Sequence, residues 1–412
     1  MQATAIPTPP AVPLKQDAAV IGVVGLAHAT SHFSHLLLAP LFPIFMKEFN
    51  LSFSDVGLLM TVFFVISGTG QALSGFVVDR IGARPVLFGA ISMFLLAALT
   101  GTVAQGYGGL MGVAVLAGLG NAPFHPADFT ILNQRVSAPR LGHAFSVHGL
   151  TGNLGWALSP VFLVGIATLS HWRTAYMAAV GLYVLVLAVL WWNRDLLLTE
   201  VVVKPAQATA GSDLQFMRLP VVWWCFAFFF LSTMTLAVIQ SYAPSILKAA
   251  HGASLELATI TVTAYMLCGA VGMAVGGFVA ARNSGQADRV VAWAMGAGAV
   301  LLLLCATGVL GATGTLVVLA ATGFAVGVGG PSRDLMIKRA TPKGATGRVY
   351  GTVYSGLDIG FAISPMIFGI FMDRGWHAAT LAGAAVTLAL AVWAAVGVGR
   401  RTVLPAPVKV VP

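Results

Sequence analysis

The sequence predicts an all-α membrane protein with twelve transmembrane helices in two six-helix halves and with both termini in the cytoplasm. Hydrophobic residues make up 58% of the 412 residues and charged residues only 8%, whereas soluble domains carry about 25% charged residues. Apolar runs of the roughly 20 residues that one crossing requires follow one another along the chain. Basic residues gather on one side of the predicted membrane.

Turn and charge signals separate the apolar runs from one another. The runs lie near 20–46, 54–78, 85–105, 108–133, 142–167, 172–192, 219–247, 255–281, 289–309, 312–337, 346–372 and 377–399. The longest polar break follows the sixth run. We therefore expect a flexible cytoplasmic tail (1–18), an N-terminal half (19–192), a cytoplasmic linker (193–218), a C-terminal half (219–399) and a second cytoplasmic tail (400–412).

The distribution of Lys and Arg sets the predicted orientation. With the N-terminus inside, seventeen of the 22 basic residues lie in cytoplasmic segments, four lie outside and Arg333 falls within a crossing. Cytoplasmic loops retain basic residues because their translocation is disfavoured. The same rule explains the net charge of +9 without a nucleic-acid partner.

Several other classes of protein are disfavoured. The three cysteines lie in apolar runs and indicate neither a disulfide framework nor a paired metal-binding motif. The chain lacks HExxH, a phosphate-binding GxxxxGK[ST] loop and a GxSxG elbow. We therefore expect no enzyme and no cofactor; an embedded enzyme would need a nucleophile and a base in register, and no such pair stands out.

The two halves repeat each other in sequence. The segment GFVVDR at 75–80 recurs as GFVAAR at 277–282, and GWALSP at 155–160 recurs as GFAISP at 360–365. Both pairs are separated by nearly the same number of residues. This regularity indicates a duplicated six-helix unit, an arrangement that places a substrate path between the halves.

The segment GFVVDRIGAR at 75–84 resembles the signature loop between the second and third helices of the major facilitator superfamily. More narrowly, GLGNAPFHP at 118–126, GLTGNLG at 149–155 and a first helix that opens with His28 resemble the fosmidomycin-resistance branch. The resemblance implies the major facilitator fold, alternating access and proton-coupled drug or metabolite efflux, as in antibiotic resistance. Two positions depart from the pattern: Ala281 stands where the first copy of the loop has Asp79, and His32 stands where the branch often has an acid.

Three histidines form a polar stripe on the first crossing. His28, His32 and His35 are spaced i, i+4 and i+7, which places them on one face of a helix. Because imidazole titrates near neutral pH, the stripe is a candidate for carrying a proton or binding an anion. The alternative is a set of neutral imidazoles that hydrogen-bond between helices. We expect no metal site, because no carboxylate or cysteine accompanies the stripe at ligand spacing.

Further candidates lie in the fourth and fifth crossings. His125 and Asp128 share a helical face beside Pro123 and Pro126, which interrupt the helical hydrogen bonds. Broken helices in membranes border cavities or protein, so this segment is predicted to lie on the substrate path. His148 is predicted to face the same cavity. The alternative is a proline kink that serves packing.

The C-terminal half contributes Arg333 and Asp334 in the tenth crossing and Asp358 in the eleventh. Intramembrane charges are costly and mark function by default. Neighbouring residues point about 100° apart, so Arg333 and Asp334 are not expected to share one partner. One alternative is that Arg333 and Asp358 form a permanent ion pair with a purely structural role. The functional alternative is that substrate or a proton competes for this pair during transport.

The loop after the second crossing is a candidate conformational latch. The resemblance implies that Gly75, Asp79, Arg80, Gly82 and Arg84 hold the halves together in one state, while the alternative is an orientation signal alone. A latch would control conformational populations rather than bind substrate.

From these observations we expect a proton-coupled transporter in a bacterial inner membrane. Histidine and arginine outnumber carboxylates among the candidates, which predicts export of a small anionic or zwitterionic substrate in exchange for protons. Proton symport of an organic acid into the cell is an alternative that uses the same residues. A receptor or assembly protein that does not transport is an alternative of another class. Nothing in the sequence requires more than a monomer.

Overall fold

The computed structural model describes residues 13–51, 53–201, 210–253, 255–342 and 344–402. Every regular element in these ranges is a helix. The α-helices are α1 (Leu14–His35), α2 (Phe42–Phe49), α3 (Phe53–Ile81), α4 (Ala83–Val103), α5 (Tyr107–Asn121), α6 (Phe124–Arg135), α7 (Leu141–Leu169), α8 (Trp172–Trp192), α9 (Pro220–His251), α10 (Leu255–Arg282), α11 (Ala287–Ala306), α12 (Gly311–Ala340), α13 (Thr346–Asp373) and α14 (His377–Thr402). Short 3-10 helices are η1 (Ala39–Leu41), η2 (Ala138–Arg140), η3 (Arg194–Leu197), η4 (Ala210–Arg218) and η5 (Ser284–Gln286).

Eleven helices in the described part of the chain are long and apolar enough to cross a membrane. The predicted fourth run is the exception, because it is divided into α5, with 15 residues, and α6, with 12. The division falls at Ala122 and Pro123, between the end of α5 and the start of α6. Proline has no amide hydrogen and cannot continue the helical hydrogen bonds. The predicted interruption of this helix is therefore confirmed.

The first predicted run, 20–46, was wrong in both of its boundaries. α1 begins earlier, at Leu14, and ends at His35, after which the chain turns through η1 and into the separate helix α2. Both η1 and α2 have a proline at one of their first two positions. Prolines are tolerated there but not in a helix interior, which explains why one continuous helix does not form.

The predicted tails are shorter than expected where the structure describes them. Residues 14–18 belong to α1. The first turn of this helix is held by Asp17, whose fully buried carboxylate accepts hydrogen bonds from the Ser137 amide (3.2 Å) and from Arg140 (2.6 Å). At the other end, α14 continues to Thr402 rather than stopping at 399. Residues 1–12, 202–209 and 403–412, which include the middle of the predicted linker, lie outside the described residues.

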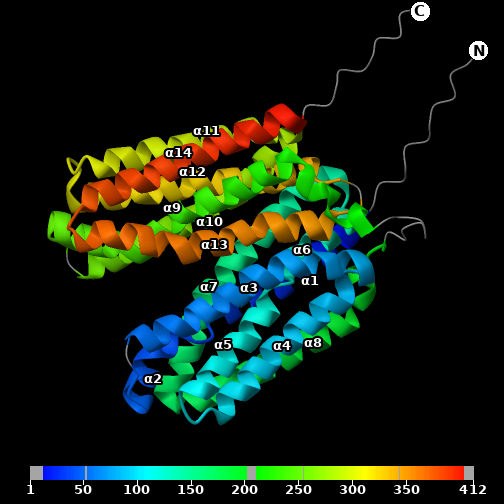
Figure 1. Ribbon diagram of the computed structural model, residues 1–412, viewed down its shortest axis with the longest axis horizontal. Coiled ribbons are helices and arrows are strands. Elements are labelled where there is room, and N and C mark those ends of the chain that lie inside the picture. The colour runs from blue at the N-terminus through cyan, green and yellow to red at the C-terminus, as the bar shows by residue number, and fades with distance from the viewer. Residues whose placement is uncertain (1–12, 52, 202–209, 254, 343, 403–412) are drawn as a thin grey trace, which may run out of the picture.

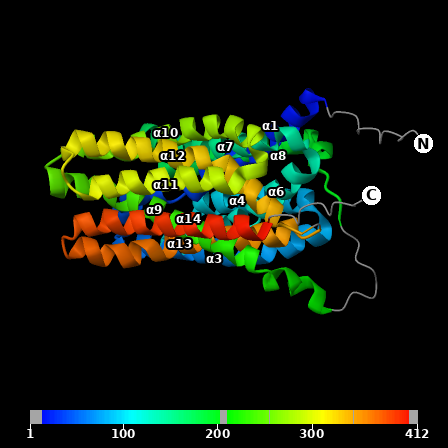
Figure 2. The same ribbon diagram turned by 90° about the horizontal axis from the view of Figure 1, so that it is seen from above.

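The helices form two groups that run along one common direction (Figure 2). Figure 1 shows α1 and α3–α8 in one group and α9–α14 in the other. The groups lie close together at the end where α1 begins and α14 finishes, here called the terminal end. They spread apart at the opposite end, where α2 lies. Contacts between the groups are made chiefly by α3 with α13 and by α7 with α10.

Glycines allow the two groups to touch at the terminal end. A Cβ atom on Gly75 of α3 would lie 2.2 Å from the carbonyl oxygen of Gly347 in α13, and a Cβ atom on Gly142 of α7 would lie 2.9 Å from the amide nitrogen of Ala281 in α10. Real side chains do not tolerate the first of these distances. The absence of a side chain at Gly75 is therefore necessary for this arrangement of α3 and α13.

Candidate functional site

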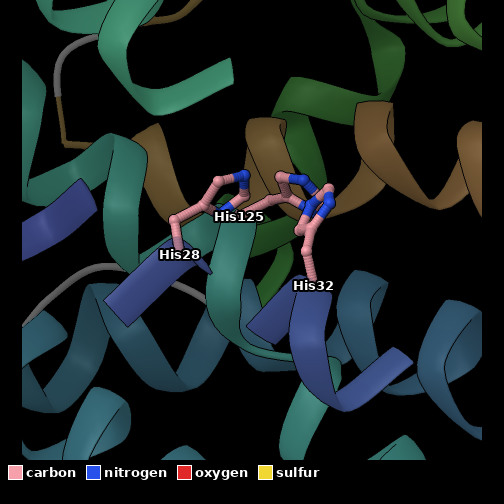
Figure 3. A group of neighbouring side chains, drawn as sticks. All are labelled: His28, His32 and His125. Carbon is pink, nitrogen blue, oxygen red and sulfur yellow. The ribbon is translucent and has the colours of Figure 1, made fainter. Parts of the chain in front are cut away.

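Three helices, α1, α6 and α7, bring the predicted histidines of the N-terminal half together. The ring centres of His28 and His148 lie 3.5 Å apart, and those of His28 and His32 lie 4.4 Å apart. His125 of α6 lies 5.5 Å from His28 and 6.5 Å from His32. Figure 3 shows His28, His32 and His125 converging from α1 and α6. The polar stripe predicted on the first crossing is thus one side of a larger cluster.

Asp128 is the carboxylate of this cluster. Its Oδ2 atom lies 3.0 Å from His28 Nδ1 and 3.2 Å from His148 Nε2, and the residue is fully buried. Its Oδ1 atom has no hydrogen-bond partner among the described residues. A buried carboxylate with an unused oxygen costs free energy unless another group or a proton satisfies it. The arrangement can therefore hold or exchange a proton between two imidazoles and one carboxylate.

His32 and His35 continue the stripe toward the end of α1. Their rings are stacked with centres 5.3 Å apart, and Trp156 of α7 lies 4.3 Å from His32. Within the described part of the chain, His32 Nδ1 and His35 Nε2 are buried and make no hydrogen bond. Trp156 and His35 line a cavity between the two groups of helices. These two imidazoles therefore connect the cluster to the cavity.

A hydrogen-bonded chain crosses from the histidine cluster to the C-terminal half. His125 Nδ1 lies 2.5 Å from Gln71 Oε1, and Gln71 Nε2 donates to Asp358 Oδ2 at 3.1 Å. Ser67 Oγ also donates to this oxygen, at 3.2 Å. Asp358 belongs to α13, whereas Gln71 and Ser67 belong to α3. The deepest acid of the C-terminal half is therefore held by the N-terminal half.

An ion pair of Arg333 with Asp358 was one of the alternatives considered, but Arg333 binds another acid. Arg333 Nε instead lies 2.9 Å from Oδ1 of its neighbour Asp334. The long guanidinium side chain turns back along α12, which the angle between adjacent Cα–Cβ bonds did not anticipate. Asp334 also accepts a hydrogen bond from Tyr354 Oη at 2.7 Å, so its carboxylate is anchored to α13. Asp334 is buried, while the Arg333 side chain remains 28% exposed.

Two neighbouring cavities lie between the groups of helices on the side away from the terminal end. The first, of about 140 Å³, is lined by Arg333 together with Asn153, Trp156, Phe228 and Tyr265. The second, of about 670 Å³, lies closer to α2 and is lined by His35, Phe64, Asn153, Trp156 and Gln240, among others. Asn153 and Trp156 line both cavities. The spaces therefore adjoin, with aromatic walls and one guanidinium.

The predicted latch residues lie at the terminal end, beside α13. Asp79 Oδ2 accepts from Arg348 Nε at 2.7 Å, and Asp79 Oδ1 accepts from the Gly347 amide at 2.9 Å. Arg84 lies 4.0 Å from the exposed Asp195. Gly82 has a positive φ of 85°, which favours glycine in the turn between α3 and α4. Arg80 is the exposed last-turn basic residue of α3.

Sequence reasoning missed four side chains that bind the predicted acids. Ser67, Gln71, Tyr354 and Arg348 complete the contacts of Asp358, Asp334 and Asp79. Gln71 is an amide within an apolar run, which was the available signal, but polar neutral residues in such runs are common. Arg348 was counted only as a cytoplasmic charge, because its partner across the interface depends on the fold.

The helices form two groups, and a polar chain connects them among segments apolar enough to cross a membrane. The sequence model of the Major Facilitator Superfamily matches residues 24–285 and again 226–410, so the chain belongs to this superfamily. It is therefore a multi-pass membrane protein, and the predicted resemblance is confirmed.

Curated relatives include transporters and a resistance protein. The Fosmidomycin resistance protein of Escherichia coli is 26% identical over 63% of this chain and 64% of its own length. The Probable L-galactonate transporter of Escherichia coli is 26% identical over 57% of this chain and 54% of its own length. The Hexuronate transporter of Bacillus subtilis is 25% identical over 64% of both. The chain thus spans 54% to 64% of the length of these relatives.

Solved structures share the fold. The transporter FucP in the outward conformation has a TM-score of 0.73 at 15% identity, covering 92% of this chain and 98% of FucP. The human organic anion transporter MFSD10 has a TM-score of 0.76 at 16% identity, covering 93% of this chain and all of MFSD10 (100%). At these identities the likeness concerns the fold alone.

Proposed function

We propose that the protein is a proton-coupled secondary active transporter of the bacterial inner membrane that exports a small anionic or zwitterionic compound in exchange for protons. In this proposal α5 and α6 together form one crossing, which gives twelve crossings with both termini in the cytoplasm. The terminal end then faces the cytoplasm, and the adjoining cavities face outward. The protein acts as a monomer.

The observation that carries the proposal is the position of Asp358. This carboxylate is 3% exposed, belongs to α13, and accepts hydrogen bonds from Ser67 and Gln71 of α3. Rocking of the two halves must separate α3 from α13 and so remove both donors. An ionised carboxylate left without donors in this environment is costly, whereas a protonated one is tolerated. Uptake of a proton by Asp358 therefore favours separation of the halves.

Arg333 is the proposed recognition site for the anionic group of the substrate. Its guanidinium lines the inner cavity and lies 4.8 Å above the Phe229 ring. Asp334 binds Arg333 Nε at 2.9 Å and Nη2 at 3.2 Å, which leaves Nη1 as the guanidinium nitrogen that Asp334 does not bind. Guanidinium groups bind carboxylates and phosphates through paired hydrogen bonds. Replacing Arg333 with Gln should therefore weaken anion binding by about 10- to 100-fold, and unchanged anion affinity would contradict this role.

The latch is proposed at the terminal end, where Asp79 binds Arg348. This contact joins α3 to α13 close to Gly75 and Gly347, so it stabilises the state in which the cytoplasmic side is closed. Arg80, Gly82 and Arg84 complete the loop. Arg84 makes a long surface contact, which contributes little.

The relatives support an anionic substrate by their names. They include transporters named for L-galactonate and hexuronate, and the Probable sulfoacetate transporter of Cupriavidus necator. The Fosmidomycin resistance protein is named for resistance to a compound, which supports export as the direction of transport. Proton symport of an organic acid is the second candidate, and the solved fucose:proton symporter FucP shares this fold. A receptor or assembly protein that does not transport is the third candidate and requires no titrating interior.

The test is proton movement in proteoliposomes that contain a pH-sensitive dye. Phosphonates, organic acids and amphiphilic drugs are added outside in turn. Entry of substrate by antiport makes the interior alkaline, symport makes it acidic, and a protein that does not transport produces neither change. We expect alkalinisation by an anion. Substrate uptake that ignores a collapsed proton gradient would contradict coupling.

A pair of variants tests the role of Asp358. Asp358→Asn should reduce substrate-evoked proton movement to background, because the side chain can no longer exchange a proton. Asp373→Asn is the matched control, since Asp373 is an exposed residue at the end of the same helix and should retain activity. Equal activity in the two variants would contradict coupling through Asp358.

A further inference from the structure

Three imidazoles from two helices converge on one point in the N-terminal half. One ring nitrogen from each of His28, His32 and His125 lies within 4.8 Å of the others. Figure 3 shows the three side chains approaching one another from α1 and α6. The spacing along α1 alone supplies only two of these ligands, because His125 is added by the packing of α6 against α1. A three-histidine group was therefore not visible in the sequence.

The hydrogen bonds of these histidines leave one nitrogen of each available. His28 uses Nδ1 for Asp128, and His125 uses Nδ1 for Gln71, so Nε2 of each ring is free to bind another group. His32 Nδ1 is buried without a hydrogen-bond partner in the described residues. A neutral imidazole that donates through one nitrogen offers a lone pair at the other.

Gly152 of α7 shows that two of these nitrogens border the same space. A Cβ atom on Gly152 would lie 3.1 Å from His28 Nε2 and 3.1 Å from His32 Nδ1. Any larger residue at this position would occupy the space between the two nitrogens. The glycine thus leaves room for a small group that both nitrogens contact.

The outer partners of the cluster match those of metal-binding histidines. Such histidines donate their second N–H to a carboxylate or carbonyl oxygen, which fixes the ring and increases the basicity of the ligand nitrogen. Asp128 serves His28 in this way, and the amide oxygen of Gln71 serves His125. Gln71 is itself held by Asp358. His28, Asp128 and His148 form a second possible set of metal ligands that also includes His28. In that set Asp128 would bind the ion directly instead of accepting a hydrogen bond from a ligand histidine.

We propose that His28, His32 and His125 bind one divalent transition-metal ion of the Zn²⁺ type, with the fourth coordination position toward the cavity side of Trp156. Three imidazoles suit Zn²⁺, Ni²⁺ and Cu²⁺, whereas Mg²⁺ and Ca²⁺ prefer oxygen ligands. All three ligands belong to the N-terminal half, so rocking of the halves leaves the group intact. The ion is therefore retained by the protein rather than carried across the membrane.

The test measures Zn²⁺ binding to the purified full chain without a polyhistidine tag. Titration against a chromophoric zinc indicator should give one site per chain that a thousandfold excess of Mg²⁺ does not displace. His32→Gln and His125→Gln should each weaken binding by at least about tenfold, and Asp128→Asn by about 10- to 100-fold. His143→Gln, which alters a histidine of α7 that contacts Phe278, is the matched control and should bind as the parent does.

Three results would overturn the proposal. They are the absence of a Zn²⁺ site in the parent protein, equal binding by His32→Gln and His143→Gln, and uptake of Zn²⁺ into proteoliposomes. X-ray absorption of the zinc-loaded protein provides a readout that does not depend on the variants folding normally, and it should report about three imidazole ligands near 2.0–2.1 Å. The binding measurements need no transport. A failure of the metal site is therefore distinguishable from a failure of the proposed transport function.

Discussion

The interface of α3 with α13 and the interface of α7 with α10 join the same two halves by different chemistry. The first contains the Asp79–Arg348 ion pair and the hydrogen bonds of Asp358. In the second, α7 has no Asp, Glu, Lys or Arg, and Ser146 Oγ donates to the Met273 carbonyl oxygen at 2.7 Å. Charge therefore holds one side of the molecule and close packing holds the other.

This difference indicates which side must change when the halves rock. Separation of α3 from α13 removes partners from charged groups, which under the proposed function are the groups that respond to protons and substrate. Separation of α7 from α10 would break mainly van der Waals contacts. We infer that the charged interface controls the conformational equilibrium and that the α7–α10 interface acts as the hinge.

The largest expected effect comes from the close approach of Gly75 to Gly347. In Gly75→Ala the new methyl carbon would lie 2.2 Å from a backbone oxygen, so α3 and α13 must move apart. Overpacking of this kind costs about 3 kcal/mol, which shifts the population away from the state closed at the terminal end. Pulsed electron paramagnetic resonance between spin labels at positions 81 and 400 should show a longer distance.

Gly57→Ala is the control for that experiment. Gly57 lies on the same helix, and a Cβ atom there meets no atom within 4 Å. Both substitutions raise helix propensity equally. If the two variants gave the same distance distribution, crowding at Gly75 would not decide the equilibrium.

Loss of the ion pair should have an intermediate effect. Asp79→Asn keeps an oxygen for the Gly347 amide but removes the charge that Arg348 binds. This change should destabilise the state closed at the terminal end, relative to the open state, by about 1–2 kcal/mol. The same spin labels should report a smaller shift than in Gly75→Ala. Asp195→Asn is the comparison, because that carboxylate is 80% exposed and 4.0 Å from Arg84. A shift of equal size in Asp195→Asn would contradict the assignment of the latch to Asp79.

The smallest effect is expected at the hinge. Ser146→Ala removes one hydrogen bond to the Met273 carbonyl oxygen and should cost about 0.5–1 kcal/mol of stability. Because this interface is expected to persist in both states, thermal unfolding should change slightly while the label distance and the transport rate stay as in the parent. A clear loss of transport by this variant would refute the division into a switch and a hinge.

The two copies of the repeat also differ more than their sequences suggested. The fourth predicted run breaks at Pro123 into α5 and α6, whereas α12 continues through Pro331 as one helix. The N-terminal copy therefore carries one imidazole and an acid on a short helix, and the C-terminal copy carries Arg333 and Asp334 on a long one. The sequence predicted the interruption in the N-terminal copy but did not reveal that α12 would continue through Pro331.

Prediction from sequence worked best where it depended on composition and spacing along one helix. The membrane class and the break at Pro123 followed from such signals, whereas the superfamily followed from the resemblance of GFVVDRIGAR at 75–84 to its signature loop. The alternative that Arg333 pairs with Asp358 failed, because a flexible guanidinium reached its neighbour Asp334 instead. The connection from His125 through Gln71 to Asp358 was also absent from the predictions, since it depends on contacts between helices far apart in the chain.

The sequence by itself determined that the chain crosses a membrane many times and that its few ionisable residues within the apolar runs include His, Asp and Arg at defined depths. Hydrophobicity and helical periodicity are local properties, so they can be read along the chain. Only the tertiary structure decided that His125 joins His28 and His32, that Asp358 depends on α3, and that Arg348 binds Asp79. Each of these contacts joins separate helices, and their relative positions are set by glycine-mediated packing that no single segment encodes.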